Sequence, residues 1–212
     1  MTVPGSSGTR IHVYNITHGF QQPTVKLDHS LGFCSLEAAL KHKNSSSIQS
    51  FVPYVHSTES ASLKSAGVGL ELTAKAGSAN SFEAAVKDIV SASIPLRVVL
   101  SHCFDIKSER DPDNNLMQAV LENDVAYLAD LGVLHIIFCD SLEKASQESL
   151  RESLEQAFYL DVVGEAMRER VGVRLKGTKR FELLKEALTI GVTKVDCIAE
   201  DLSQVLALAR PT

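Results

Sequence analysis

The stretch LADLGVLHIIFCDS, residues 128–141, joins the end of a helix to an apolar strand through one glycine. An amphipathic pattern over 116–131 predicts the helix, and Gly132 directly after it is typical of a helix C-terminus. The run at 134–139 is too apolar for a strand with one face in water, so it indicates a strand covered on both faces. The stretch therefore predicts one step of a parallel sheet that is flanked by helices.

The same order of helix, glycine and strand recurs in LLKEALTIGVTKVDCI, residues 183–198, where Gly191 precedes the apolar run. Repeated units of this kind favour a (β/α) barrel of the TIM type or a doubly wound α/β sheet. Seven strands are predicted, and the widest interval without one lies between Ile16 and Phe51. The predicted strands cover residues 10–16, 51–56, 68–74, 94–101, 134–139, 171–175 and 194–198.

Length and composition set the domain organisation. The 212 residues, of which 44% are hydrophobic, are enough for one sizeable core, so we expect a single domain over 10–212 after a flexible N-terminal segment, 1–9. Acidic residues outnumber Lys plus Arg by 26 to 21, which argues against a nucleic-acid-binding protein. No apolar run approaches the roughly 18 residues of a membrane span.

The four cysteines, Cys34, Cys103, Cys139 and Cys197, are widely spaced and form no CxxC pair. This spacing favours neither a zinc ribbon nor a disulfide framework, and it is typical of reduced, mostly buried thiols. The first ten residues lack the apolar segment of a secretory signal. We therefore expect the protein in the mitochondrial matrix or the cytoplasm.

From residue 51 to 202 the chain resembles the 3-hydroxy-3-methylglutaryl-CoA (HMG-CoA) lyase family of metal-dependent TIM barrels. The stretch 128–141 resembles the family's sixth strand, with Cys139-Asp140-Ser141 in place of Gly-Asp-Thr. Four further segments resemble family strands in the same order. They are RIHVYNITHGFQQ (10–22), KSAGVGLELTAKAG (64–77), LRVVLSHC (96–103) and the stretch at 183–202. The resemblance implies a barrel with its chemistry at the carboxyl ends of the strands, a divalent cation and a carbon–carbon lyase reaction.

The chain departs from the family where the resemblance implies the cation site. His18 and Thr17 occupy the positions of the first-strand Asp and its neighbouring Arg. The family's His-x-His pair corresponds to Arg174 and Lys176, which would repel a cation. Asp140 alone remains of the catalytic constellation. The family's second βα unit has no recognisable counterpart between residues 22 and 48.

These departures favour a catalytically degenerate barrel that needs no cofactor and acts as a structural or binding subunit of a larger, possibly mitochondrial assembly of proteins. Residues 22–50 would cover the gap in such a barrel. The alternative is an active, diverged lyase or aldolase that uses His18, Asp140 and a divalent cation on an acyl-CoA or oxo acid. A third interpretation is a doubly wound α/β domain that binds a small ligand, although no GxGxxG or GxxxxGK phosphate loop occurs.

Two groups of residues are candidate sites. His18, His56 and His102 all lie at predicted strand ends and are candidates for a replacement metal site, although no pair has ligand spacing. Arg174, Lys176, Lys179 and Arg180 follow the seventh strand. This basic cluster predicts a site for an anion such as a carboxylate or a CoA phosphate, or for an acidic protein partner. A solvated βα loop is the favoured explanation of the same residues.

Overall fold

The computed structural model describes residues 12–15, 32–33, 54–55, 69–104, 115–160 and 165–208. The strands among these residues form one parallel sheet in the order β1-β8-β7-β6-β5-β4-β3-β2. The strands are β1 (His12–Asn15), β2 (Gly32–Phe33), β3 (Tyr54–Val55), β4 (Gly69–Lys75), β5 (Leu96–Ser101), β6 (His135–Cys139), β7 (Val171–Arg174) and β8 (Lys194–Cys197).

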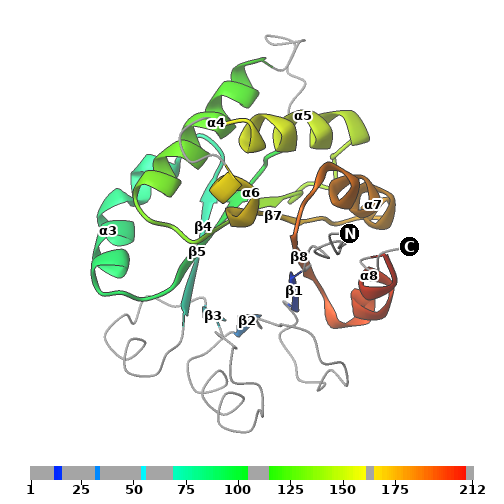
Figure 1. Ribbon diagram of the computed structural model, residues 1–212, viewed down its shortest axis with the longest axis horizontal. Coiled ribbons are helices and arrows are strands. Elements are labelled where there is room, and N and C mark those ends of the chain that lie inside the picture. Colours follow the sequence, from blue (N-terminus) through cyan, green and yellow to red (C-terminus); the bar gives the residue numbers. More distant parts are fainter. Residues whose placement is uncertain are drawn as a thin grey trace, which may run out of the picture.

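Helices alternate with the strands and lie outside the sheet (Figure 1). They are the short 3-10 helices η1 (Ala79–Phe82) and η2 (Ala199–Asp201), and α3 (Glu83–Ser91), α4 (Asn115–Asp130), α5 (Gln147–Phe158), α6 (Glu165–Arg170), α7 (Arg180–Ile190) and α8 (Leu202–Leu208). The predicted αβ steps are confirmed, because α4 leads into β6 and α7 into β8. In the described part of the chain, no helix is long and apolar enough to cross a membrane.

The sheet has eight strands where the sequence pattern predicted seven. The additional strand is β2, which lies in the interval between Ile16 and Phe51 where the sequence pattern predicts no βα unit. Its two residues, Gly-Phe, are too few to produce the alternation by which a strand is recognised in sequence. Among the described residues β1 pairs only with β8 and β2 only with β3. The barrel is therefore not closed between β1 and β2 in this part of the structure.

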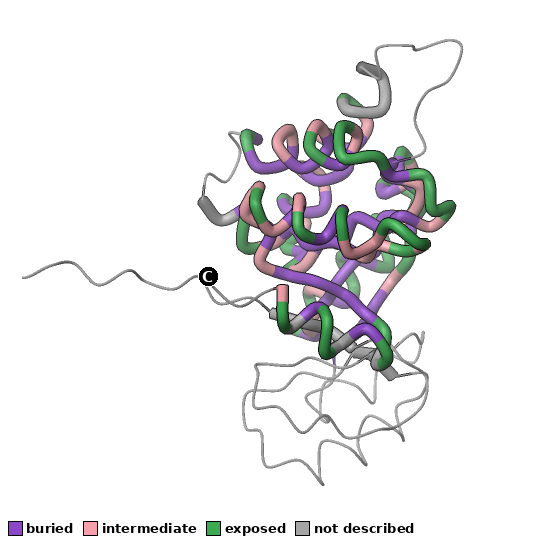
Figure 2. Tube along the Cα trace, turned by 90° about the vertical axis from the view of Figure 1, so that its right-hand side faces the viewer, coloured by how far each residue is buried: buried purple, intermediate pink, exposed green. Residues whose placement is uncertain are grey.

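Side chains of the well-covered strands alternate between two environments. Val98 and Leu100 of β5 belong to the large apolar core between sheet and helices. Val99 belongs instead to a small separate cluster with Ile137 and Cys139. Because successive residues of a strand point to opposite faces, this second cluster marks the inward face of the sheet. Figure 2 shows that buried and exposed residues alternate along the helices, as expected for helices with one face packed in the core.

Local signals explain where two of the helices begin and end. Gly191 closes α7 in the left-handed conformation, with φ +111°, and its N–H donates to the carbonyls of Ala187 and Leu188. The Ser146 side chain accepts a hydrogen bond from the backbone N–H of Ser149 and caps α5. The Ser146 cap fixes the end of the loop after β6, which carries Glu143 of the candidate site, and Gly191 fixes the turn that leads into β8. The predictions for residues 1–9 and for the covering role of 22–50 fall outside the described residues, β2 excepted.

Candidate site at the carboxyl ends of the strands

Four charged side chains from four strands meet on the inward face of the sheet. Arg97 of β5 contacts Glu71 of β4, with Nε 3.0 Å from Oε2, and also forms an ion pair with Asp196 of β8. Arg174 of β7 donates from Nη2 to both oxygens of Glu71 at 3.0 Å. Its Nε lies 2.8 Å and its Nη2 2.7 Å from Oδ2 of Asp196. Each guanidinium therefore bridges both carboxylates.

This ion cluster, Glu71, Arg97, Arg174 and Asp196, is almost completely withdrawn from water and carries no net charge. Three of its side chains are at most 1% exposed, and that of Arg174 is 12% exposed. Burial by itself lowers the pKa of Arg174, but the charges of Asp196 and Glu71 outweigh that effect and raise the pKa above its ordinary value. The pKa of Arg97 is raised by the same balance. Both guanidiniums thus remain charged partners of the two carboxylates.

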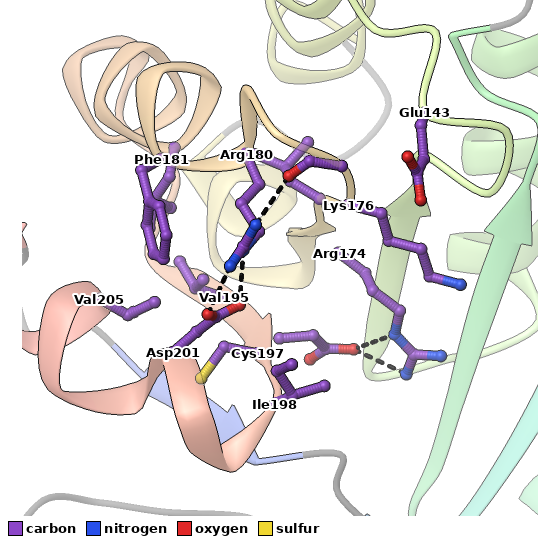
Figure 3. A pocket seen from close by; sticks show the side chains of 14 residues that line it. Glu143, Arg174, Lys176, Arg180, Phe181, Val195, Cys197, Ile198, Asp201 and Val205 are labelled. Atoms are coloured by element: carbon purple, nitrogen blue, oxygen red, sulfur yellow. Dashed lines mark hydrogen bonds and ion pairs between the residues drawn. The ribbon is translucent and has the colours of Figure 1, made fainter.

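A cavity of about 390 Å³ opens beside this cluster, at the carboxyl ends of β7 and β8 (Figure 3). Phe181 and Leu184 of α7, Val195 of β8 and Val205 of α8 form an apolar wall. Active sites of TIM barrels lie at this end of the strands, so the cavity is in the position where ligands bind to this fold.

Arg180 and Asp201 join the two loops that border the cavity. The Arg180 guanidinium donates from Nε and Nη2 to the two oxygens of Asp201 at 2.7 and 2.8 Å, and from Nη1 to the Gly177 carbonyl at 2.9 Å. It also lies over the ring of Phe181, 4.5 Å from the centroid. This clamp holds the β7–α7 loop against η2 and neutralises both charges locally.

The structure brings three members of the predicted basic cluster around the cavity. Arg174, Lys176 and Arg180 line it, whereas Lys179 is the residue before α7 and is not part of the lining. Arg174 is engaged in the ion cluster and Arg180 in the clamp. Lys176 is exposed and forms no ion pair within the described residues. Binding of an anion or an acidic partner by these residues stays a prediction.

Of the three histidines proposed as metal ligands, only His102 is described; His18 and His56 lie outside the described residues. His102 directly follows β5 with φ +64°, and its backbone N–H donates to Ser141 Oγ at 3.0 Å. Its ring Nδ1 lies 3.1 Å from Ser101 Oγ. Within the described part of the chain, no group of three or more His, Cys, Asp or Glu side chains is arranged to hold a metal ion.

Asp140, the candidate catalytic acid, organises the loop after β6. The carboxylate is buried, and its Oδ1 accepts the backbone N–H groups of Lys144 at 2.9 Å and Ala145 at 3.3 Å. A carboxylate that receives two backbone donors is a loop cap, and it stabilises the turn that leads toward α5. The observed hydrogen bonds therefore account for an aspartate at this position without a catalytic role.

Three of the four cysteines are buried free thiols: Cys103, Cys139 and Cys197. Burial raises the pKa of each, and that of Cys197 reaches about 12, compared with 9.0 for an ordinary thiol. At pH 8, a thiol with a pKa of about 12 carries about a thousandfold less thiolate than a thiol with a pKa of 9.0.

We expect Cys197 of the native protein to react with iodoacetamide at least about a hundredfold more slowly than in denatured protein, because alkylation requires a thiolate that the reagent can reach. Peptide mapping by mass spectrometry measures each site separately. Cys103 is an internal control that is buried in the core and should be equally slow. Native labelling of Cys197 at the denatured rate would contradict the placement of this thiol.

Sequence reasoning did not single out Glu71, Arg97 and Asp196 as members of one site. Each lies in an apolar strand, and a charged residue in a strand covered on both faces must find a partner of opposite charge. Two acids and two arginines at such positions were therefore a usable signal. Their pairing depends on the strand register, which places Glu71 beside Arg97 and Arg174 beside Asp196.

Comparison with known proteins identifies the fold. No protein-family model matches the chain, and no curated protein matches it by sequence. An HMG-CoA lyase from Bacillus subtilis superposes with a TM-score of 0.70 at 10% identity, covering 96% of this chain and 88% of that one. A hydroxymethylglutaryl-CoA lyase from Pseudomonas aeruginosa gives 0.68 at 13% identity, with 94% and 85% covered.

The carboxyl transferase domain of Rhizobium etli pyruvate carboxylase also has a TM-score of 0.68, at 11% identity. It covers 92% of this chain but only 41% of the other, longer chain. The resemblance inferred from five sequence segments is thereby confirmed at the level of the fold. The chain has the TIM-barrel fold of the HMG-CoA lyases and of the pyruvate carboxylase carboxyl transferase domain.

Proposed function

We propose that this protein is a catalytically degenerate lyase-type barrel that serves as a binding or structural subunit. The observation that carries the proposal is the position of the Arg174 guanidinium between the carboxylates of Glu71 and Asp196. The resemblance aligns Arg174 with the first residue of the family's His-x-His pair. A permanent cation thus stands where the family's cation-dependent chemistry needs neutral ligands.

The described donors do not fit a divalent cation. Both carboxylates of the ion cluster are already held by guanidinium groups, and Arg97 adds a second positive charge on the same oxygens. A metal ion placed there would be repelled by two buried cations in a region of low dielectric constant. Displacement of either arginine would leave a buried charge without its partner, which is costly.

The active-lyase alternative rests on His18, which lies outside the described residues, and on Asp140. The hydrogen bonds of Asp140 to the Lys144 and Ala145 backbone occupy one oxygen of that carboxylate. This favours the degenerate barrel over the lyase. The two alternatives differ in two measurable properties: uptake of a divalent cation and cleavage of an acyl-CoA.

We expect the purified full chain to bind no stoichiometric Mn²⁺ at millimolar concentration and to leave HMG-CoA intact, because the ion cluster repels the cation. Electron paramagnetic resonance of free Mn²⁺ measures the first property, and chromatography of the CoA products measures the second. An Asp140→Asn variant serves as the matched control. Stoichiometric Mn²⁺ binding and thioester cleavage that are both lost in Asp140→Asn would establish the active lyase instead.

The subunit role is supported by the two outermost strands. Among the described residues, β1 and β2 each pair with one neighbour, and strand edges of this kind are covered in stable proteins. We infer that other protein subunits supply part of that cover, in the mitochondrial matrix or the cytoplasm. Light scattering on the purified chain tests the inference. A soluble, monodisperse monomer that unfolds cooperatively would contradict it.

A further inference from the structure

We propose that the cavity at the ends of β7 and β8 is a docking site for a protein partner. It receives one large apolar side chain of a partner segment, and an acidic residue beside that anchor faces the β7–α7 loop. The inference rests on the proposed function, because it names the surface and the kind of partner that a binding subunit of this fold would use. It requires neither a metal nor the carboxylate of Asp140.

The cavity lies between the sheet and its helices, not inside the barrel. Val195 and Cys197 of β8 line it, and both belong to the main apolar core on the helix side of the sheet. Asp196, between them in the sequence, points to the opposite face, where its carboxylate is buried in the ion cluster. A side chain that enters the cavity therefore meets apolar atoms and not the buried charges of the cluster.

The size and lining of the cavity suit a single apolar anchor. Its volume of about 390 Å³ is at the small end of the range for ligand pockets. Phe181 and Leu184 of α7 and Val205 of α8 form its helical side, and Figure 3 shows Lys176 on the side away from Phe181 and Val205. At protein interfaces a few side chains that fill desolvated pockets carry most of the binding energy. One leucine or phenylalanine from the partner therefore suffices here.

The mouth of the cavity carries large apolar side chains that are exposed to water. Ile198 lines the cavity and is 40% exposed. Leu142 is 46% exposed and directly precedes Glu143, another residue of the lining. A small ligand inside the cavity would leave both side chains in water, whereas a protein segment laid across the mouth would cover them. The exposed apolar surface thus favours a protein partner over a small ligand.

Charges around the mouth select an acidic residue beside the anchor and fix its direction. Lys176 and Lys179 on the β7–α7 loop are exposed and form no ion pair within the described residues. Acidic side chains lie on the other loops, with Glu143 after β6 and Glu200 next to the lining residue Asp201 in η2. An acidic residue of the partner is therefore complementary to the β7–α7 loop and would be repelled at η2.

A library of random dodecapeptides displayed on phage, selected against the immobilised full chain, tests the chemistry of this partner. We expect the enriched peptides to share a leucine or phenylalanine with an aspartate or glutamate beside it. Calorimetry on a synthetic peptide of that consensus then measures the affinity, and replacing its apolar anchor with alanine should weaken binding at least about tenfold. Absence of enrichment, or enrichment of basic peptides without an apolar anchor, would overturn the proposal.

Variants of the full chain place the bound peptide. Val205→Phe fills the cavity from α8 and should weaken the consensus peptide at least about tenfold. Ile198→Ser changes an exposed side chain at the mouth, which leaves the core intact, and should weaken it about threefold. Lys176→Glu combined with Lys179→Glu should weaken it about fivefold and remove most of its salt dependence. Lys185→Glu, on the exposed side of α7 outside the lining, is the control and should bind like the wild type.

The rival occupants give different results in the same measurements. Peptide binding that is unchanged in both Val205→Phe and Ile198→Ser would place the docking site elsewhere, which would overturn this inference and leave the binding-subunit function standing. N-acetyl-leucinamide that binds as tightly as the peptide would mark the cavity as a small-ligand site. Dimerisation of the wild type that Val205→Phe abolishes would assign the cavity to a second copy of this chain. Either result would overturn the proposal.

Discussion

Replacing Arg97 with methionine should lower the free energy of unfolding by about 3–5 kcal/mol, a large part of the 5–15 kcal/mol typical of a folded domain. Methionine matches much of the length of the arginine but cannot pair with a carboxylate. Glu71 and Asp196 would then share Arg174 alone, and one negative charge would stay buried without compensation. Urea denaturation followed by circular dichroism measures the change.

A surface arginine with the same kind of partners provides the control for this prediction. Arg151 forms ion pairs with Glu155 and Glu186, but its side chain is 49% exposed. Arg151→Met should therefore cost less than about 1 kcal/mol. Similar losses in the two variants would mean that burial of the ion cluster does not determine its importance.

The loss in Arg97→Met is expected to depend on the charge of Glu71. Glu71→Gln, made together with Arg97→Met, removes the carboxylate charge that Arg97→Met alone would leave uncompensated. The double variant should be more stable than Arg97→Met by at least about 1 kcal/mol, since contacting residues of one network couple strongly. Losses that simply add would contradict this electrostatic explanation.

The second half of the fold follows from sequence because its signals are local and repeated. Gly132 and Gly191 both follow helices in the left-handed conformation, and each lies three residues before the next strand begins. The same rules do not detect β2, because its pairing with β3 is a tertiary event and its two residues carry no pattern. A strand of that length is recognisable only once the rest of the sheet is in place.

The candidate site was less predictable, because it depends on which strands are neighbours. Arg174 was assigned to a basic loop cluster from its proximity in sequence to Lys176 and Arg180. In the structure the Arg174 side chain lies on the inward face of the sheet. Its partners there, Glu71 and Asp196, are 103 and 22 positions away in the sequence. Strand alternation alone would place Arg174 and Lys176 on the same face, because they are two residues apart. They differ because β7 ends at Arg174, so that Lys176 lies in the following loop, and the exact end of a strand is not evident from the sequence.

Adding one methyl group at Gly172 should destabilise the protein by about 1–3 kcal/mol, the cost of overpacking an interior that has no room to relax. A Cβ on Gly172 would lie 2.7 Å from Lys194 Cβ, 2.8 Å from Ile137 Cδ1 and 2.8 Å from the Lys194 carbonyl oxygen. The Lys194 carbonyl oxygen belongs to the backbone of the neighbouring strand β8, and the position of Lys194 Cβ is fixed by that backbone. The strand pair would have to separate, and Arg174 two residues later would lose its alignment with Asp196.

Two further variants distinguish crowding from a general effect of replacing glycine. Gly191→Ala adds the same methyl group where no atom lies within 4 Å, so its cost of about 1 kcal/mol would come from the backbone angle alone. Ile137 Cδ1 is the one clashing atom at the end of a flexible side chain, and Ile137→Val removes it. Combined with Gly172→Ala, Ile137→Val should therefore recover only part of the stability that Gly172→Ala loses. Thermal or urea unfolding of the set measures this coupling. Full recovery would show that the side chain of Ile137, rather than the backbone of β8, limits the space at Gly172, and no recovery would place the whole restriction on β8.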